Sequence, residues 1–166
     1  MYLLNVIDVG LKEKTMRLWH KDLIPYLPKM QLLGQWRELC CIGVNLANDH
    51  TPNHILVNPI LDYSPEHFEY FCNMVIREMK VRKFEINEQT LKTLQQNIRA
   101  WRLYLGLELP FDYVGNWDMN LEDELFDDWH NNRYLRQCYY NLEEKYDRGG
   151  VPQDEWMRIF SNFGGI

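Results

Sequence analysis

The residues best suited to chemistry lie in the stretch QLLGQWREL, which begins at Gln31 and places Arg37 directly before Glu38. A carboxylate beside an arginine and near amide side chains can stabilise a developing positive charge or transfer a proton. The amides are Gln31 and Gln35, and Gly34 leaves room for a ligand to approach the helix backbone. These residues form a candidate site. The alternative is an ordinary solvated helix face.

Helical periodicity places this candidate site on one side of a helix over residues 31–48. At about 100° per residue, the apolar side chains gather on one face, and Glu38 lies near the middle of the other. The predicted apolar face contains Leu32, Leu33, Trp36, Leu39, Cys40, Gly43, Val44, Leu46 and Ala47. The predicted polar face contains Gln31, Gly34, Gln35, Arg37, Glu38, Cys41 and Asn45.

The rest of the chain also has the hydrophobic pattern of helices, which predicts an all-α fold: a single compact domain of three main helices plus shorter helices. The second main helix is expected at 64–83, because Ser64 can cap it and Pro65 suits the first helical position. The third is expected between Asn87 and Gly106. The remaining expectations are a loop at 51–63 with a short extended piece at 55–57, and shorter helices at 121–129, 133–147 and 153–162.

Histidine and cysteine side chains offer two other chemistries. His50 and His54 are four residues apart, and with His20 and Cys40 they could bind a metal ion. The sequence TPNH is typical of a loop, so structural histidines are the favoured interpretation, and no metal or other cofactor is predicted. Cys40 and Cys41 have no adjacent base that would favour a nucleophilic thiolate.

The distribution of charge bears on the partner. The formal net charge of −6 by itself argues against nucleic acid. However, the segment 110–130 holds seven acidic and no Lys or Arg residues, so the rest of the chain has 18 basic against 17 acidic residues (24 less 7). A local basic surface is therefore compatible with the composition. The acidic segment is expected to be a solvated surface, with binding of a basic partner as the alternative.

The spacing of the cysteines and the length of the apolar segments bear on where in the cell the protein is located. The four cysteines have no disulfide-like spacing, and no apolar run has the length of a transmembrane helix. The opening MYLLNVIDVG lacks the basic start and the cleavage site of a secretion signal. A cytoplasmic protein with no membrane partner is expected.

Four blocks of sequence occur in an order that resembles a known family. They are MRLWHKDLIPYLPKMQLLGQWREL, TPNHILVNPILDY, the helix ending REMKVRKFEI, and YLRQCYYNLEEKYDRGG. They resemble the pyrimidine-dimer DNA glycosylases of the phage endonuclease V type and their bacterial relatives. The resemblance covers most of residues 16–150, whereas residues 1–15 and the acidic segment have no clear counterpart.

The resemblance implies an enzyme that extrudes a nucleotide and cuts the glycosidic bond of a cyclobutane pyrimidine dimer in duplex DNA. It implies that the nucleophile is the α-amino group of the mature N-terminus, which forms an imine at the sugar C1′, after which β-elimination nicks the strand. The family's essential glutamate matches Glu38, and the arginine before it matches Arg37. An α-amine has a reference pKa of about 7.7–8.0, so much of it is a free nucleophile at neutral pH.

The resemblance also implies contacts with DNA. Arg17 corresponds to a basic residue close to the amino terminus, His54 to a histidine before the middle helix, and Lys145 to a lysine of the late helix. Two basic positions of the family are occupied here by Cys41 and Asn141, which predicts weaker DNA affinity or a different substrate. The full set of predicted DNA-binding residues is Arg17, Lys21, Gln31, Gln35, His54 and Lys145.

The start of the chain departs from the family, because residues 1–15 precede the position expected for the amine. One interpretation is a real extension that moves or abolishes the amine and leaves water, a lysine such as Lys21, or no catalysis. The other is that translation begins at Met16. Methionine before the bulky Arg17 should be retained, so the amine would then belong to Met16, and residues 16–166 would form a single glycosylase-like domain.

The sequence therefore predicts a DNA-repair glycosylase, with or without AP-lyase activity, that acts on damaged double-stranded DNA. A monomer in the cytoplasm, associated with the nucleoid through DNA, is expected. The alternative is a non-catalytic DNA- or protein-binding member of the same fold.

Overall fold

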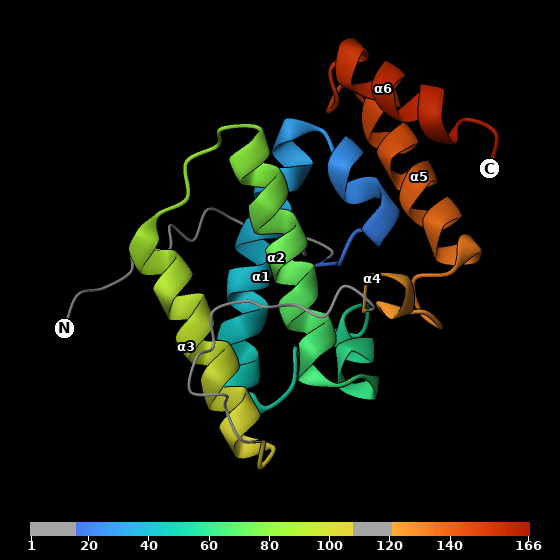
Figure 1. Ribbon diagram of the computed structural model, residues 1–166. Coiled ribbons are helices and arrows are strands. Elements are labelled where there is room, and N and C mark those ends of the chain that lie inside the picture. Colours follow the sequence, from blue (N-terminus) through green and yellow to red (C-terminus); the bar gives the residue numbers. More distant parts are fainter. Residues whose placement is uncertain (1–15, 108–120) are drawn as a thin grey trace.

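Helices dominate the protein in a computed structural model, which describes residues 16–107 and 121–166 (Figure 1). No β-strand occurs in these two ranges, and the predicted all-α class is confirmed. The α-helices are α1 (Lys29–Asp49), α2 (Pro65–Val81), α3 (Glu88–Tyr104), α4 (Leu121–Glu124), α5 (Asn132–Asp147) and α6 (Gln153–Phe163). Two 3-10 helices, η1 (Lys21–Tyr26) and η2 (Asn58–Asp62), lie before α1 and before α2.

Helix α1 is the element around which the main helices assemble, because it packs against both α2 and α3 (Figure 1). A glycine makes the contact with α3 close: a Cβ added at Gly43 would lie 2.7 Å from Leu94 Cδ1. The fully buried aliphatic side chains of α1 recur at helical spacing, as periodicity predicted. They are Leu32, Leu39, Ile42 and Leu46.

Helices α2 and α3 begin where local sequence signals predicted. Pro65 is the first residue of α2, and the Asn87 side chain caps α3 by accepting a hydrogen bond from the backbone N–H of Thr90 at 3.0 Å. Phe68 and Trp101 pack edge to face across the two helices, with ring centroids 6.3 Å apart. The helices end at Val81 and Tyr104, close to the predicted boundaries.

A set of charged side chains also joins α2 to α3: Glu69 and Arg102 are buried, and Glu66 is partly exposed. We call these three residues the α2–α3 ion cluster. Nη1 of the buried Arg102 donates to Glu66 Oε1 at 2.8 Å and to Glu69 Oε1 at 3.1 Å. Burial raises the pKa of Glu69 to about 7, although the charge of Arg102 acts in the opposite direction. The cluster therefore combines an ion pair with a costly desolvation.

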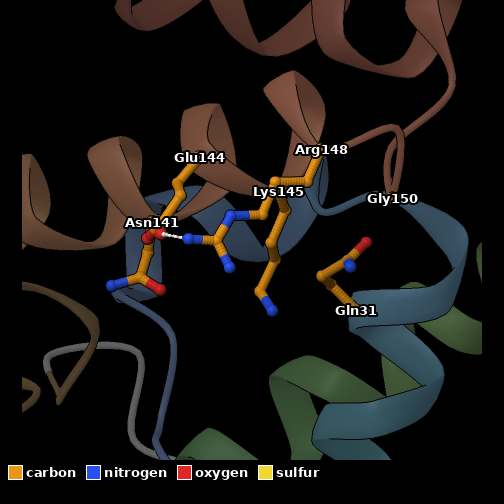
Figure 2. Close-up of a pocket in the computed structure, with 6 residues that line it drawn as sticks. All are labelled: Gln31, Asn141, Glu144, Lys145, Arg148 and Gly150. Atoms are coloured by element: carbon orange, nitrogen blue, oxygen red, sulfur yellow. Dashed lines mark ion pairs between the residues drawn. The ribbon is translucent and has the colours of Figure 1, made fainter.

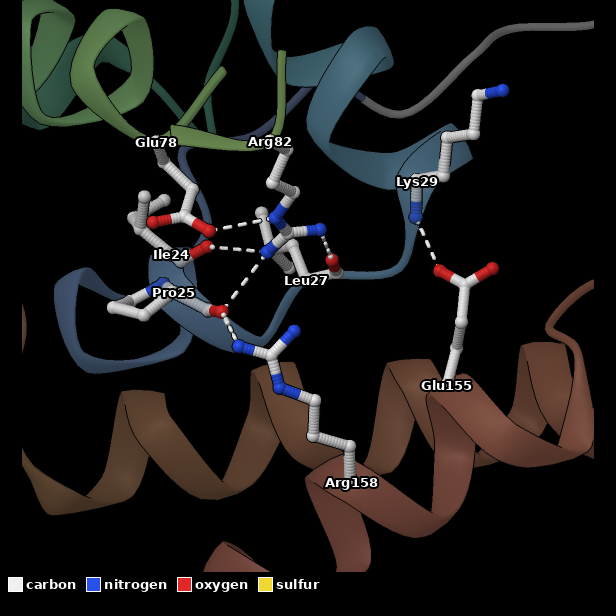
Figure 3. Close-up of polar contacts among 8 residues, drawn as sticks. All are labelled: Ile24, Pro25, Leu27, Lys29, Glu78, Arg82, Glu155 and Arg158. Carbon is white, nitrogen blue, oxygen red and sulfur yellow. Dashed lines mark hydrogen bonds and ion pairs between the residues drawn. The ribbon is translucent and has the colours of Figure 1, made fainter. Parts of the chain in front are cut away.

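The segment before α1 is bound to both α2 and α6, as Figure 3 shows. The carbonyl oxygen of Pro25 accepts hydrogen bonds from Arg82 Nη2 and from Arg158 Nη2, each at 2.9 Å. The backbone N–H of Lys29, at the start of α1, donates to Glu155 Oε2 at 2.5 Å. Helix α6 is thereby attached to the main helices through η1 and the first residue of α1.

Two local predictions are wrong. The expected extended piece at 55–57 consists of turns that lead into η2, because the backbone N–H groups of Val57 and Asn58 both donate to the carbonyl oxygen of His54. The helix expected over 121–129 ends at Glu124, and Phe126 has a positive φ of 50° that a continuing helix does not permit.

The apolar faces are narrower than periodicity predicted. Val44 on α1 is 42% exposed, and Leu105, at the end of α3, is 46% exposed. Neighbouring helices cover only a stripe of α1, so an apolar residue at the edge of that stripe remains in solvent.

Several predictions lie outside the described residues, namely the extension 1–15 and the part of the acidic segment from 110 to 120. Within the described ranges, no helix combines the length and the apolar character needed to cross a membrane.

Candidate functional site

Helix α1 places Glu38 beside the segment of chain that begins at Met16. Gln35 lies one turn before Glu38, and its side-chain amide contacts both Glu38 and the segment that begins at Met16. Its Oε1 accepts a hydrogen bond from the backbone N–H of Trp19 at 2.7 Å, and its Nε2 donates to the carbonyl oxygen of Arg17 at 3.0 Å. The same Nε2 lies 3.4 Å from Glu38 Oε2. The segment backbone and the carboxylate therefore share one amide group.

This position of Gln35 corrects the predicted polar face. Its side chain is fully buried, with 0% exposure, so it does not reach the surface that was expected to contact DNA. Its hydrogen bonds satisfy both ends of the amide within the protein. Periodicity placed Gln35 correctly on the side of Glu38, but it could not show that the segment before η1 covers this part of the helix.

Helix α5 holds the same segment from a second direction. The Tyr134 hydroxyl donates a hydrogen bond to the carbonyl oxygen of Leu18. Burial, and then the neighbouring Cys138, raise the pKa of Tyr134, so the hydroxyl keeps its proton and remains a donor. The Arg17 guanidinium carbon lies 5.1 Å from the ring centroid of Trp19. Residues 17, 18 and 19 are thus each bound through a backbone group.

A histidine pair continues this binding. Nε2 of His20 donates to the carbonyl oxygen of His130 at 2.7 Å, and Nδ1 of His130 accepts from the backbone N–H of Lys21 at 3.0 Å. Burial lowers the pKa of His20, and it lowers the pKa of His130 to about 2, so both rings are neutral at physiological pH. We call the following set the segment clamp: Gln35, Tyr134 and His130, which bind the backbone of residues 17–21.

The cysteines near Glu38 are protonated thiols. Burial, and then the charge of Glu38, raise the pKa of Cys41, and burial raises the pKa of Cys40 to about 12. Neither side chain has the lowered pKa of a nucleophilic cysteine. Cys41 is exposed on the site face, in the position where the resembled family has a basic residue.

The histidines considered for a metal site are dispersed among other contacts. The ring of His50 stacks on that of Tyr104, and His54 Nδ1 accepts from the backbone N–H of Leu56 at 3.2 Å. Throughout residues 16–107 and 121–166, no three His, Cys, Asp or Glu side chains are grouped in a way that could hold a metal ion.

An open pocket of about 250 Å³ lies between the start of α1 and the end of α5. In Figure 2, the side chains of Lys145 and Gln31 extend toward the same space from the two helices. Arg148 forms an ion pair with Glu144 at 2.6 Å, and Gln31 Oε1 is buried without a hydrogen-bond partner. The pocket can therefore accept a group that presents negative charge to Lys145 and a hydrogen-bond donor to Gln31 Oε1. Its lining residues are Gln31, Asn141, Glu144, Lys145, Arg148 and Gly150.

The remaining predicted site residues lie around Glu38 and the segment clamp, or in the loop before η2. Arg37 is exposed on α1 next to Glu38. Lys21 is half-buried, and its Nζ donates to the carbonyl oxygen of Asp123 at 3.3 Å. His54 is half-buried in the loop before η2. The structure thus brings Arg17, Gln35 and Glu38 together, and separately Gln31 and Lys145, whereas His54 contributes to its own loop.

Reasoning from the sequence missed the contributions of Tyr134 and His130. Both lie in the stretch WHNNRYLRQC, where Asn131 caps α5 by accepting a hydrogen bond from the backbone N–H of Tyr134. The only sequence signal was a tryptophan and a histidine in the turn directly before this helix, whose later part lies in one of the resembled blocks. Their contacts are with residues more than 100 positions earlier, so periodicity could not have found them.

Fold and site together define a class of protein, a small all-α domain with two polar features. The half-buried carboxylate of Glu38 lies beside the segment 17–21, and a neighbouring pocket is lined by the side chain of Lys145. Residues 16–92 match the family model described as pyrimidine dimer DNA glycosylase, which confirms the resemblance over this part of the chain. At the level of the family, the match supports a DNA-repair enzyme of the glycosylase type that acts on DNA. Searches of curated proteins and of solved structures gave no significant match.

Proposed function

We propose that this protein is a pyrimidine dimer DNA glycosylase with AP-lyase activity, in which Glu38 and an N-terminal amine at Met16 carry out the chemistry. One observation carries the proposal: the Gln35 amide bonds both the backbone of Arg17 and the carboxylate of Glu38. An amine one residue before Arg17 would therefore start from a position close to that carboxylate. The family match also begins at Met16, which supports this position for the amine.

The proposed reaction divides the work between these two groups. The amine lone pair attacks the sugar C1′, the glycosidic bond to the base breaks, and the base leaves with the bonding electrons. Loss of an amine proton and opening of the sugar ring, with a proton taken up at O4′, give the imine. Glu38 stabilises positive charge on the sugar and then removes the 2′ proton, so that the bond from C3′ to the phosphate oxygen breaks. Arg37 lies next to this carboxylate and contacts the adjacent backbone of DNA.

We assign DNA binding to side chains around the same face. Arg17 and Lys21 flank the site, and Lys145 and Gln31 in the pocket hold a phosphate or an extruded nucleotide. His54 contacts DNA from the loop before η2. Gln35 acts from the interior and not through direct contact. The substrate is damaged duplex bound by a monomer, and the protein is located in the cytoplasm with the nucleoid.

The test uses duplex DNA that contains one cyclobutane pyrimidine dimer, with sodium borohydride to trap an imine. Glu38→Gln should lower the rate of strand cleavage by about 10²–10⁴-fold, because the variant can no longer accept a proton. Glu85→Gln, at an exposed position between α2 and α3, is the control and should cleave at the normal rate.

The same assay tests the amine. Protein that begins at Met16 should form a borohydride-trapped adduct, and protein that begins at Met1 should not. Strand cleavage that survives Glu38→Gln would refute the assignment of the site. DNA binding that is independent of damage, with no product from either form, would indicate the non-catalytic alternative.

A further inference from the structure

The deepest polar contact of the site is made by a side chain that does not reach the surface. Gln35 is fully buried, yet its amide reaches the backbone of two residues in the segment and the carboxylate of Glu38. From these contacts, and resting on the proposed function, we infer that Gln35 is a positioning residue that sets the N-terminal segment and the Glu38 carboxylate in register with each other.

The geometry of the amide gives it this double role. Its oxygen accepts from the Trp19 N–H and its nitrogen donates to the Arg17 oxygen, two residues earlier. The amide thus needs an N–H group opposite its oxygen and a carbonyl group opposite its nitrogen. A shift of the segment by one residue would place the wrong backbone group opposite each atom, so these two hydrogen bonds fix the position of the segment along α1. The amide orientation is thereby determined by the backbone, and the remaining N–H of Nε2 points to Glu38 at 3.4 Å.

Gln35 differs in this respect from the other members of the segment clamp. Tyr134 bonds the Leu18 carbonyl oxygen and His130 bonds the Lys21 N–H, but each has a different, separate partner. The Gln35 amide, by contrast, bonds both the segment backbone and the Glu38 carboxylate. A loss of Tyr134 would remove a contact to the segment alone, whereas a loss of Gln35 would remove contacts to the segment and to the Glu38 carboxylate together.

The physical consequence is preorganisation. Holding a nucleophile and a general base in the reactive geometry lowers the barrier, and a misplacement of about 1 Å can cost about 10²-fold in rate. DNA affinity should depend little on Gln35, because phosphate contacts come from other, exposed side chains. The rate of the chemical step should therefore change far more than the dissociation constant.

The experiment compares variants expressed from the gene with its natural upstream sequence. The mass of the N-terminal peptide of each preparation shows whether the protein begins at Met1 or at Met16. Gln35→Met keeps the length and apolar volume of the side chain and removes every polar contact. Its single-turnover cleavage of dimer-containing duplex should be about 10²-fold slower, with the dissociation constant for DNA within about threefold of the wild-type value. The protection of the Trp19 amide against hydrogen exchange should be lost in the same variant.

Two further variants separate positioning from stability. Gln35→Glu keeps the acceptor for Trp19 but places a second carboxyl beside Glu38, so the acidic limb of its pH–rate profile should move to higher pH. Asn87→Ala removes the cap of α3, far along the chain from the site, and should lower the melting temperature with an unchanged cleavage rate and pH profile.

The outcomes separate this inference from the proposed function. Wild-type cleavage together with normal cleavage by Gln35→Met would overturn the inference and leave the proposed function intact. If Gln35→Met cleaves more slowly but the pH–rate profile of Gln35→Glu is not shifted, Gln35 has only a structural role. That result would also overturn the inference. A wild-type protein that cleaves no dimer would refute the proposed function, and the inference with it, whatever the exchange data show.

Discussion

The two buried polar regions of this molecule are built on different principles. The α2–α3 ion cluster places the charge of Arg102 between two carboxylates, and Glu69 is almost fully buried there. The segment clamp uses only groups that are neutral at physiological pH, each bonded to a backbone atom. Removing charges from water costs several kcal/mol per ion, whereas a neutral amide or hydroxyl that finds its partner costs little.

This difference has a functional meaning. The α2–α3 ion cluster joins two helices at side chains that can adjust, and its energy depends on ionisation. The segment clamp binds backbone atoms, so it defines the path of the chain itself, and its imidazole (His130) and its phenol (Tyr134) stay neutral through the physiological range. A segment that carries a reactive end needs the second kind of attachment. Two predictions test the comparison directly, and a third tests the open face of α1 beside the clamp.

The largest effect is expected for Arg102→Met. The change leaves Glu69 buried without its cation, which should lower the free energy of unfolding by about 3–5 kcal/mol. Chemical denaturation in urea at pH 8 measures this loss, and Arg99→Met, at an exposed position one turn earlier on α3, is the matched control. A loss of less than about 1 kcal/mol would show that the ion pair contributes little net stability.

A smaller effect on stability is expected when one titrating group is removed from each region. The contributions of His130 and Glu69 to stability should depend on pH in opposite directions. The folded-state pKa of His130 lies far below that of the free side chain, so between about pH 6.5 and pH 2 the unfolded chain binds the extra proton and stability falls as pH falls. The folded-state pKa of Glu69 is raised from 4.5 to about 7, so over that window the folded chain binds the extra proton and stability falls as pH rises.

The measurement is the melting temperature from pH 4 to pH 8. His130→Phe should lose about 1–3 kcal/mol at pH 7, because the Lys21 N–H loses its acceptor, and its stability should decline less than that of the wild type on acidification. Glu69→Gln should decline less on going from pH 5 to pH 8. Parallel pH curves for the wild type and both variants would contradict the contrast between the two regions.

The smallest effect is expected at Gly34, on the face of α1 between Gln31 and Glu38. A Cβ at this position would have no atom within 4 Å, so Gly34→Ala should stabilise the helix by about 0.5–1 kcal/mol. If DNA approaches the backbone here, cleavage should fall several-fold while the melting temperature rises. Gly43→Ala is the contrasting variant, since its Cβ would meet Leu94, and it should be less stable. Unchanged cleavage by the more stable Gly34→Ala would place the DNA elsewhere.

Much of the fold was accessible to reasoning from the sequence, because its signals are local. The cap at Asn87 and the proline at the start of α2 marked real helix boundaries, and the leucines of α1 marked its buried stripe. The extended piece at 55–57 was mispredicted because turn-forming hydrogen bonds to the His54 carbonyl prevailed over the propensity of branched residues for strands.

The candidate site could be predicted only in part. The pair Arg37-Glu38 was recognised from its residue types and its place among four ordered blocks, and the family match over residues 16–92 supports that interpretation at the level of the family. The burial of Gln35 and the roles of Tyr134 and His130 were not accessible. Each depends on where residues 17–21 lie against α1 and α5, and no short window of sequence contains that information.

The sequence by itself determined the helices, their buried stripes and the presence of a carboxylate with an arginine before it, since propensity, capping and periodicity act over a few residues. Only the tertiary structure decided what surrounds that carboxylate. It turned Gln35 from an apparent surface residue into the buried link between Glu38 and the segment after Met16. The physical reason is that a buried amide must pair with whatever backbone the fold brings to it, and the fold brings residues 17 and 19.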